Sequence, residues 1–165
     1  MSLTLRAPAV ALVAIALALP GKATFAVTMC TIGVTPMVFG NYNPVNGPAL
    51  QVDATVTATC TTTTLPLAAV QYSLQVGVST GSGTMARQLA GPNGSRLSYN
   101  VYTSAAYATV WGDGTGGTSS VSGGVTPVAL GVPAVASHTA FGRVPALQAV
   151  RVGAYGDSLL VTILY

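Results

Sequence analysis

The chain has 165 residues, of which 50% are hydrophobic and only 5% are charged, with a formal net charge of +3. Two of the six basic residues, Arg6 and Lys22, lie near the N-terminus, and the remainder of the chain carries four arginines against three aspartates. This nearly neutral remainder gives no support for a nucleic-acid partner or for attraction to an acidic membrane surface.

The N-terminal residues 1–26 have the pattern of a secretory signal peptide. Arg6 precedes an uncharged apolar run from Ala9 to Leu19, which is too short to span a membrane. We expect cleavage after Ala23 or Ala26, whereas a cut after Ala18 would fall inside the apolar run. The sequence predicts no membrane span after this cleavage.

Residues 27–165 form the predicted exported domain, and Cys30 and Cys60 are its only cysteines. Because an exported chain passes through an oxidising compartment, the sequence predicts one disulfide between them. The residue numbers differ by 60 − 30 = 30. Closing a loop of about that length stabilises the folded state by about 3.5 kcal/mol in the chain-entropy treatment.

Alternating apolar and polar residues from Cys30 onward predict an all-β domain, since no segment combines helical spacing with helix-forming residues. The expected strands are 31–39, 50–60, 70–78, 95–103, 125–132, 137–144 and a C-terminal strand within 153–165. Asn93-Gly94 predicts a hairpin turn, and the glycine-rich stretch 112–124 predicts a flexible loop. Many short strands with hairpin turns favour a two-sheet sandwich.

The C-terminal strand has apolar residues on both faces. Leu159, Val161 and Ile163 alternate with Leu160 and Leu164. Two apolar faces are typical of a strand inside a sheet and not of an exposed edge.

Candidate catalytic and metal-binding residues are few. His138 is the single histidine, glutamate does not occur, and the three aspartates Asp53, Asp113 and Asp157 lie in separate turn-like or solvent-facing contexts. We therefore predict no catalytic site, no metal site and no cofactor, expect His138 to be a polar surface residue, and expect His138→Ala to be silent.

Two other features could indicate a ligand: a glycine-rich stretch and a group of aromatic residues. The glycine-rich stretch 112–124 lacks the lysine and the following helix that a phosphate-binding loop needs. Trp111, Tyr99, Tyr102 and Tyr107 could form an aromatic platform for a sugar, but packing in the core and at the sandwich edge is the favoured interpretation.

Several motifs taken in order resemble the spore coat U domain family, which includes subunits of archaic chaperone-usher pili. The resemblance covers Cys30 to Tyr165, essentially the whole mature chain. The motifs are Val38-Phe39-Gly40-Asn41-Tyr42 after Cys30, the alternating strand closed by Cys60, Arg87-Gln88-Leu89, Leu97 to Tyr102, Trp111-Gly112, Phe141-Gly142-Arg143-Val144 and the terminal Gly153 to Ser158.

The resemblance implies an incomplete immunoglobulin-like β-sandwich that lacks its final strand and leaves an apolar acceptor groove. It implies that Leu159, Val161, Ile163 and Val38 line this groove. A periplasmic chaperone would lend a strand, and a neighbouring subunit would replace that strand at the outer-membrane usher. The chain would then be exported through the periplasm to a surface fibre or an extracellular coat.

At its N-terminus the chain differs from subunits that polymerise by donating a strand. Cleavage after Ala23 or Ala26 leaves at most six residues before Cys30, which span only about 20 Å and are too few to fill a groove. This predicts a subunit that accepts a strand but donates none, at a fibre tip, at a chain end or in a coat. A surface- or carbohydrate-binding adhesin domain is the alternative, followed by an enzyme or inhibitor.

Overall fold

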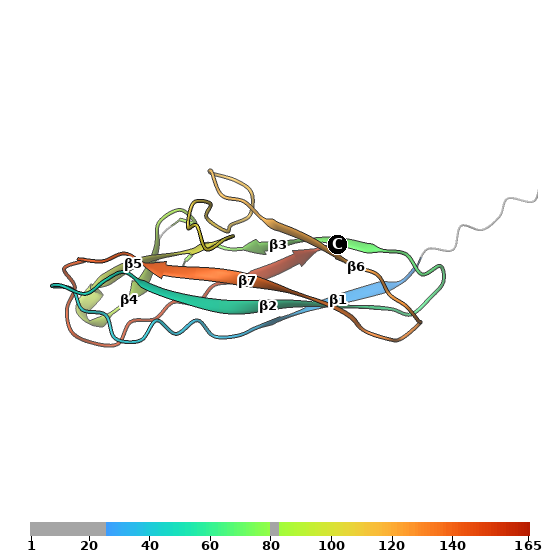
Figure 1. Ribbon diagram of the computed structural model, residues 1–165, viewed down its shortest axis with the longest axis horizontal. Coiled ribbons are helices and arrows are strands. Elements are labelled where there is room, and N and C mark those ends of the chain that lie inside the picture. The colour runs from blue at the N-terminus through green and yellow to red at the C-terminus, as the bar shows by residue number, and fades with distance from the viewer. Residues whose placement is uncertain (1–25, 80–82) are drawn as a thin grey trace, which may run out of the picture.

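Eight strands and one short turn make up the part of the chain that the computed structural model describes, residues 26–79 and 83–165 (Figure 1). The strands are β1 (Thr28–Val34), β2 (Leu50–Thr62), β3 (Val70–Val76), β4 (Arg87–Ala90), β5 (Arg96–Tyr102), β6 (Val121–Val125), β7 (Ala134–Val144) and β8 (Val161–Leu164), and the turn η1 is Pro92–Gly94. Apart from Ala26, the predicted leader lies outside the described residues. No helix in the described part is both long and apolar enough to cross a membrane.

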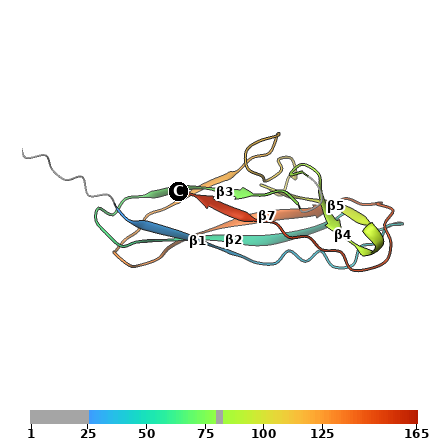
Figure 2. The ribbon, with the colours of Figure 1, turned by 180° about the vertical axis from the view of Figure 1, so that it is seen from behind.

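The strands form two sheets that pack face to face, as the sequence predicted. The larger sheet has the order β1-β2-β7-β5-β4, and the smaller has the order β6-β3-β8. Figure 1 shows β7 passing in front of β8, and the reverse view in Figure 2 shows β8 in front of β7. This all-β, two-sheet arrangement is that of an immunoglobulin-like sandwich.

The core lies between the sheets and is built from the alternating faces that the sequence indicated. In β2, Ala54, Val56, Ala58 and Cys60 are buried, while their neighbours point to the outer face. The same alternation buries the inward residues of β3 and β5. Trp111, which follows β5, is 0% exposed and donates its indole N–H to the Leu74 carbonyl at 3.0 Å.

The predicted disulfide is present between Cys30 and Cys60. The two residues lie directly opposite each other in the β1–β2 ladder, with their Cα atoms 4.1 Å apart. The bond therefore fastens the edge strand β1 to β2.

The hairpin turn predicted at Asn93-Gly94 is also confirmed. Ala90 of β4 pairs with Arg96 of β5, and the Ser95 N–H donates to the Pro92 carbonyl at 3.0 Å. Asn93 and Gly94 have φ values of 51° and 75°. Two consecutive left-handed residues define the tight turn that suits twisted antiparallel strands.

Some predicted strand positions were wrong. β1 ends at Val34 and not near residue 39, because the following proline at position 36 cannot donate to the ladder. No strand covers 126–132, since β6 already ends at Val125. Part of the expected loop 112–124 belongs to β6, and β4 was not predicted at all.

Candidate functional site

The last strand, β8, is an edge strand and does not lie inside a sheet as its two apolar faces suggested. It pairs only with β3 among the described strands, and the Gly77 N–H donates to the Leu160 carbonyl at 2.8 Å. Backbone groups of successive residues point to opposite edges of a strand. Leu159, Val161 and Ile163 therefore direct their N–H and C=O groups away from β3, toward an edge that no described strand covers.

β1 presents a matching free edge. The Thr35 N–H donates to the Thr55 carbonyl at 3.0 Å, on the side of β1 that pairs with β2. By the same alternation, Cys30, Ile32 and Val34 direct their backbone groups away from β2. Cα atoms of β1 and β8 approach within 8 Å of each other, so the two free edges flank one gap between the sheets.

An apolar cavity of about 220 Å³ opens between these edges. One wall is the end of β1 and the segment after it, with Val34, Met37 and Phe39, and the opposite wall contains Leu159 and Val161. Its floor consists of inward residues from the core strands. A dry cavity of about 150 Å³ can hold a benzene ring, so this one has room for a bulky apolar side chain.

A polar group borders the apolar cavity. Asp157 lines it and accepts a hydrogen bond at 2.7 Å from the hydroxyl of Tyr99, which also lines it. Burial raises the pKa of Tyr99, and the hydrogen bond to Asp157 raises it further. The Asp157 carboxylate also accepts from the Ser158 N–H at 2.8 Å. These bonds fix the backbone immediately before β8.

Arg87 supports this end of the sandwich from within the core. Its side chain is 0% exposed and donates to the carbonyls of Val76, Gly77 and Trp111 at 3.1, 3.0 and 2.8 Å, and to Asn100 Oδ1 at 2.8 Å. Burial lowers the pKa of Arg87, while Tyr99 and Asp157 act in the opposite direction. The arginine thus joins the end of β3 to β4, β5 and the segment after β5.

The four groove residues expected from the resemblance have different positions. Leu159 and Val161 line the cavity. Ile163 is partly buried against the core, whereas Val38 is 73% exposed and does not line the cavity. Its neighbours Met37 and Phe39 point inward, which the sequence did not reveal because residues 37–39 are all apolar.

His138 is not the surface residue that was predicted. It is half-buried on the inward face of β7, where its Nε2 lies 2.8 Å from the Tyr72 hydroxyl and the two rings meet edge to face at 5.7 Å. The three aspartates lie apart, and no group of three or more His, Cys, Asp or Glu side chains in the described part could hold a metal ion.

Trp111 and Tyr99 pack in the core, as the favoured interpretation expected, so the four rings do not form one platform at the surface. Trp111 is fully buried and Tyr99 is buried, so neither ring can stack on a ligand at the surface. Tyr102 and Tyr107 are half-buried and contact each other.

Comparisons with known proteins agree with this architecture. No curated protein matches the sequence. A chain of the pre-assembly complex between the chaperone CsuC and the tip adhesion subunit CsuE, from the archaic chaperone-usher Csu pili of Acinetobacter baumannii, has a similar structure, with a TM-score of 0.57 and 14% identity. The match covers 84% of this chain but only 40% of that one. The model of the Spore Coat Protein U domain matches residues 17–162. The chain therefore belongs to the Spore Coat Protein U domain family.

Proposed function

We propose that this chain is a structural subunit of an archaic chaperone-usher fibre, which binds an extended strand from another polypeptide in the gap between β1 and β8. The observation that carries the proposal is the pair of free strand edges flanking an apolar cavity. An uncovered edge above an apolar interior is prone to aggregation unless another strand pairs with it. Family membership and the fold shared with a chain of a chaperone–subunit complex support the same function.

The process is strand addition and exchange, without covalent chemistry. Backbone groups of Leu159, Val161 and Ile163 would form the ladder with the incoming strand, and alternate apolar side chains of that strand would enter the cavity. The first donor would be a periplasmic chaperone, and a neighbouring subunit would replace it at the outer-membrane usher.

Insertion requires movement of the groove walls. A strand placed between two others needs about 9.6 Å between its neighbours, which is twice the ordinary strand spacing. β1 and β8 approach more closely than this, since some of their Cα atoms lie within 8 Å. The two edges must therefore separate where they are closest, while the cavity beyond Val34 is already open.

The chain is proposed to accept a strand without donating one. β1 begins at Thr28, and the Val27 carbonyl already accepts from the Thr63 N–H at 2.9 Å. With cleavage after Ala26, all three residues before Cys30 are therefore used in the subunit's own sheet, and cleavage after Ala23 adds only three residues ahead of Val27. Mass spectrometry of the mature N-terminus tests this point, because a start at or before Leu19 would restore a donor segment.

The acceptor function is tested by co-expression with the cognate chaperone. Val161→Asp places a carboxylate in the cavity wall and should abolish the soluble one-to-one complex. Leu160→Asp is the matched control, because Leu160 is 74% exposed on the opposite face and should leave capture intact. Equal capture of both variants would contradict the proposal.

A further inference from the structure

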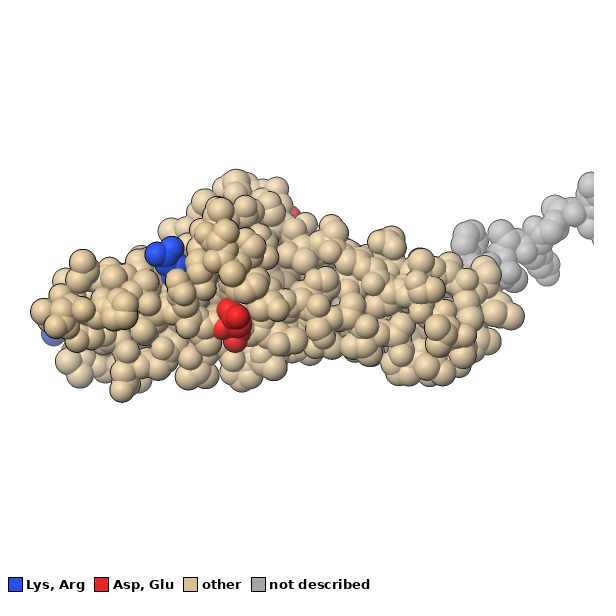
Figure 3. Space-filling view, viewed as in Figure 1, with Lys and Arg blue, Asp and Glu red and all other residues tan. Residues whose placement is uncertain are grey.

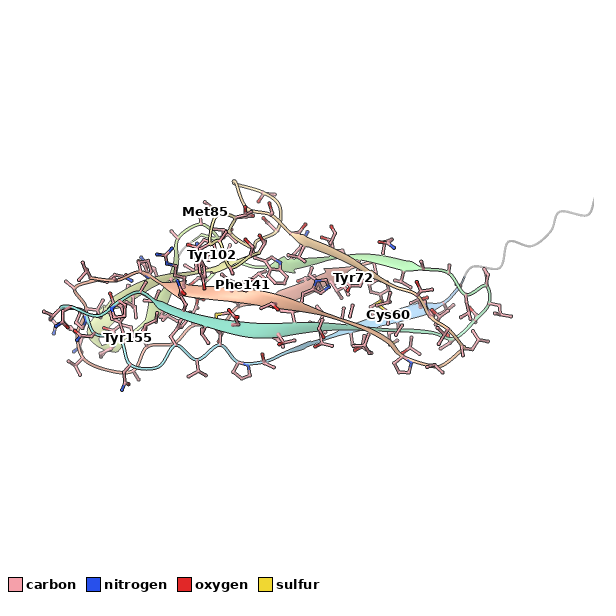
Figure 4. All side chains as sticks on the ribbon, in the orientation of Figure 1. Cys60, Tyr72, Met85, Tyr102, Phe141 and Tyr155 are labelled. Atoms are coloured by element: carbon pink, nitrogen blue, oxygen red, sulfur yellow. A yellow bond between two sulfur atoms is a disulfide. The ribbon has the colours of Figure 1, made fainter. Side chains whose placement is uncertain are left out.

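The outer face of the five-stranded sheet gathers aromatic and polar side chains from three strands. Asp53 of β2 pairs with Phe141 of β7, which pairs with Tyr102 of β5. In the next row, Gln51 of β2 pairs with Arg143 of β7. Because these positions alternate with buried ones, all five side chains point to the outer face. Figure 4 shows Phe141 and Tyr102 near each other.

Tyr107 joins this group from the loop after β5. It has a φ of 52°, a left-handed conformation that an aromatic residue rarely adopts. In this conformation its ring meets that of Tyr102 edge to face, with centroids 5.4 Å apart and an interplanar angle of 87°. The guanidinium carbon of Arg143 lies 5.4 Å from the centroid of the Tyr107 ring. An unfavourable backbone conformation thus positions a ring beside a cation.

The polar groups of the cluster have unused hydrogen-bonding capacity. Arg143 makes no hydrogen bond or ion pair with any described residue, and its Nε is buried without a partner. Arg87, in contrast, uses its guanidinium donors on backbone carbonyls and Asn100. Asp53 and Gln51 are exposed, and neither side chain bonds to a residue in the described part.

These properties match the chemistry of a neutral sugar. A pyranose has an apolar C–H face that packs on an aromatic ring, and hydroxyls that donate to a carboxylate and accept from a guanidinium. Arg143 and Asp53 have opposite charges, so the cluster does not favour an anionic ligand. Around it the face carries mainly hydroxyls such as Thr55 and Thr139, and Figure 3 shows few charged groups.

We propose that Tyr102, Tyr107, Phe141 and Arg143, flanked by Asp53 and Gln51, form a binding site for a neutral saccharide. The sheet holds most of these residues, so the site exists before the ligand arrives. It lies on the outer face of the large sheet, whereas the acceptor groove opens between β1 and β8, so both can be occupied at once.

The test is affinity electrophoresis of the exported chain in gels containing laminarin, galactomannan or hydroxyethyl cellulose, with alginate as the acidic comparison. Tyr107→Asn removes the ring but keeps a residue that tolerates the left-handed conformation. Arg143→Gln removes the guanidinium. Arg151→Gln is the matched control, because Arg151 is an exposed arginine whose described hydrogen bonds use only its backbone.

We expect at least one neutral polysaccharide to retard the unaltered chain. Tyr107→Asn and Arg143→Gln should each weaken this retardation by about tenfold, and Arg151→Gln should leave it unchanged. Fluorescence of the buried Trp111 checks that each variant is folded. The proposal is overturned if no neutral polysaccharide retards the folded chain, if only alginate does, or if the two site variants bind as well as the control.

Discussion

Arg87 shows how a single charged residue can hold this sandwich together from inside. Its guanidinium satisfies the carbonyls of Val76, Gly77 and Trp111, which its removal would leave buried without donors. We expect Arg87→Met to lower the free energy of unfolding by about 3 kcal/mol. The exposed Arg96→Met should change it by less than about 0.5 kcal/mol. Urea unfolding followed by Trp111 fluorescence measures both, and similar losses would contradict this role.

Tyr99 and Tyr72 make the domain sensitive to alkali. Burial raises the pKa of both hydroxyls, and for Tyr99 the bond to Asp157 adds to the effect. The folded protein therefore holds these protons more tightly than the unfolded chain does. Their contribution to the free energy of unfolding is fully present below the ordinary tyrosine pKa of about 10. It is lost as the pH rises from there through the raised pKa of the folded protein. The urea midpoint should fall above about pH 10, and less steeply in Tyr99→Phe; an unchanged slope would exclude Tyr99 as a cause.

His138 also contributes through its partner. Tyr72 is 4% exposed, and His138 Nε2 is the group its hydroxyl contacts across the two sheets. His138→Ala would leave a buried hydroxyl without that partner and open space beside it. We now expect a loss of about 1 to 2 kcal/mol in unfolding free energy instead of a silent change. Tyr72→Phe combined with His138→Ala should cost less than the two single losses added, as double-mutant unfolding curves would show.

The β4–β5 hairpin depends on its turn residues. Gly94 has a φ of 75°, so an alanine there would be strained even though nothing lies within 4 Å of its added Cβ. We expect Gly94→Ala to cost about 1 kcal/mol. Gly33→Ala is the control, because Gly33 also has open space but an ordinary strand conformation. Equal urea midpoints for the two variants would show that the turn conformation is unimportant.

Strands in which apolar and polar residues strictly alternate could be predicted from the sequence. Strands whose position depends on pairing with a distant strand could not. Residues 50–60 were predicted nearly as observed because one face is continuously apolar. Residues 126–132 are mostly apolar but form no strand, since the chain turns after β6 and pairs again only from Ala134. β4 was missed because it is short and its first residue is a buried arginine, which local patterns do not indicate.

The residues of the candidate sites, like the strands, could be predicted only in part. The family resemblance pointed to Leu159 and Val161, both of which line the cavity. The opposite wall could not be assigned between Val38 and its neighbours, because alternation carries no information where every residue is apolar. The Tyr107–Arg143 contact depends on a cross-strand register and on a left-handed loop residue, and neither can be read from composition or periodicity.

At the scale of the whole molecule, the disulfide links domain stability to the shape of the gap. β1 pairs only with β2 in the described part, and its other edge forms one side of the gap. Cys30–Cys60 fastens this strand across the ladder. The bond therefore opposes unfolding of the chain and detachment of β1 alone.

Replacing both cysteines with alanine tests these two effects together. We expect the unfolding free energy to fall by about 3 kcal/mol, because the unfolded chain regains the entropy of an open loop. Amide hydrogen exchange should accelerate more in β1 than in β7, since β7 lies inside the five-stranded sheet and keeps a strand on each side. Reducing the unaltered chain should reproduce both changes. If exchange rises equally in β1 and β7, the bond stabilises the domain as a whole and does not selectively hold the wall of the gap.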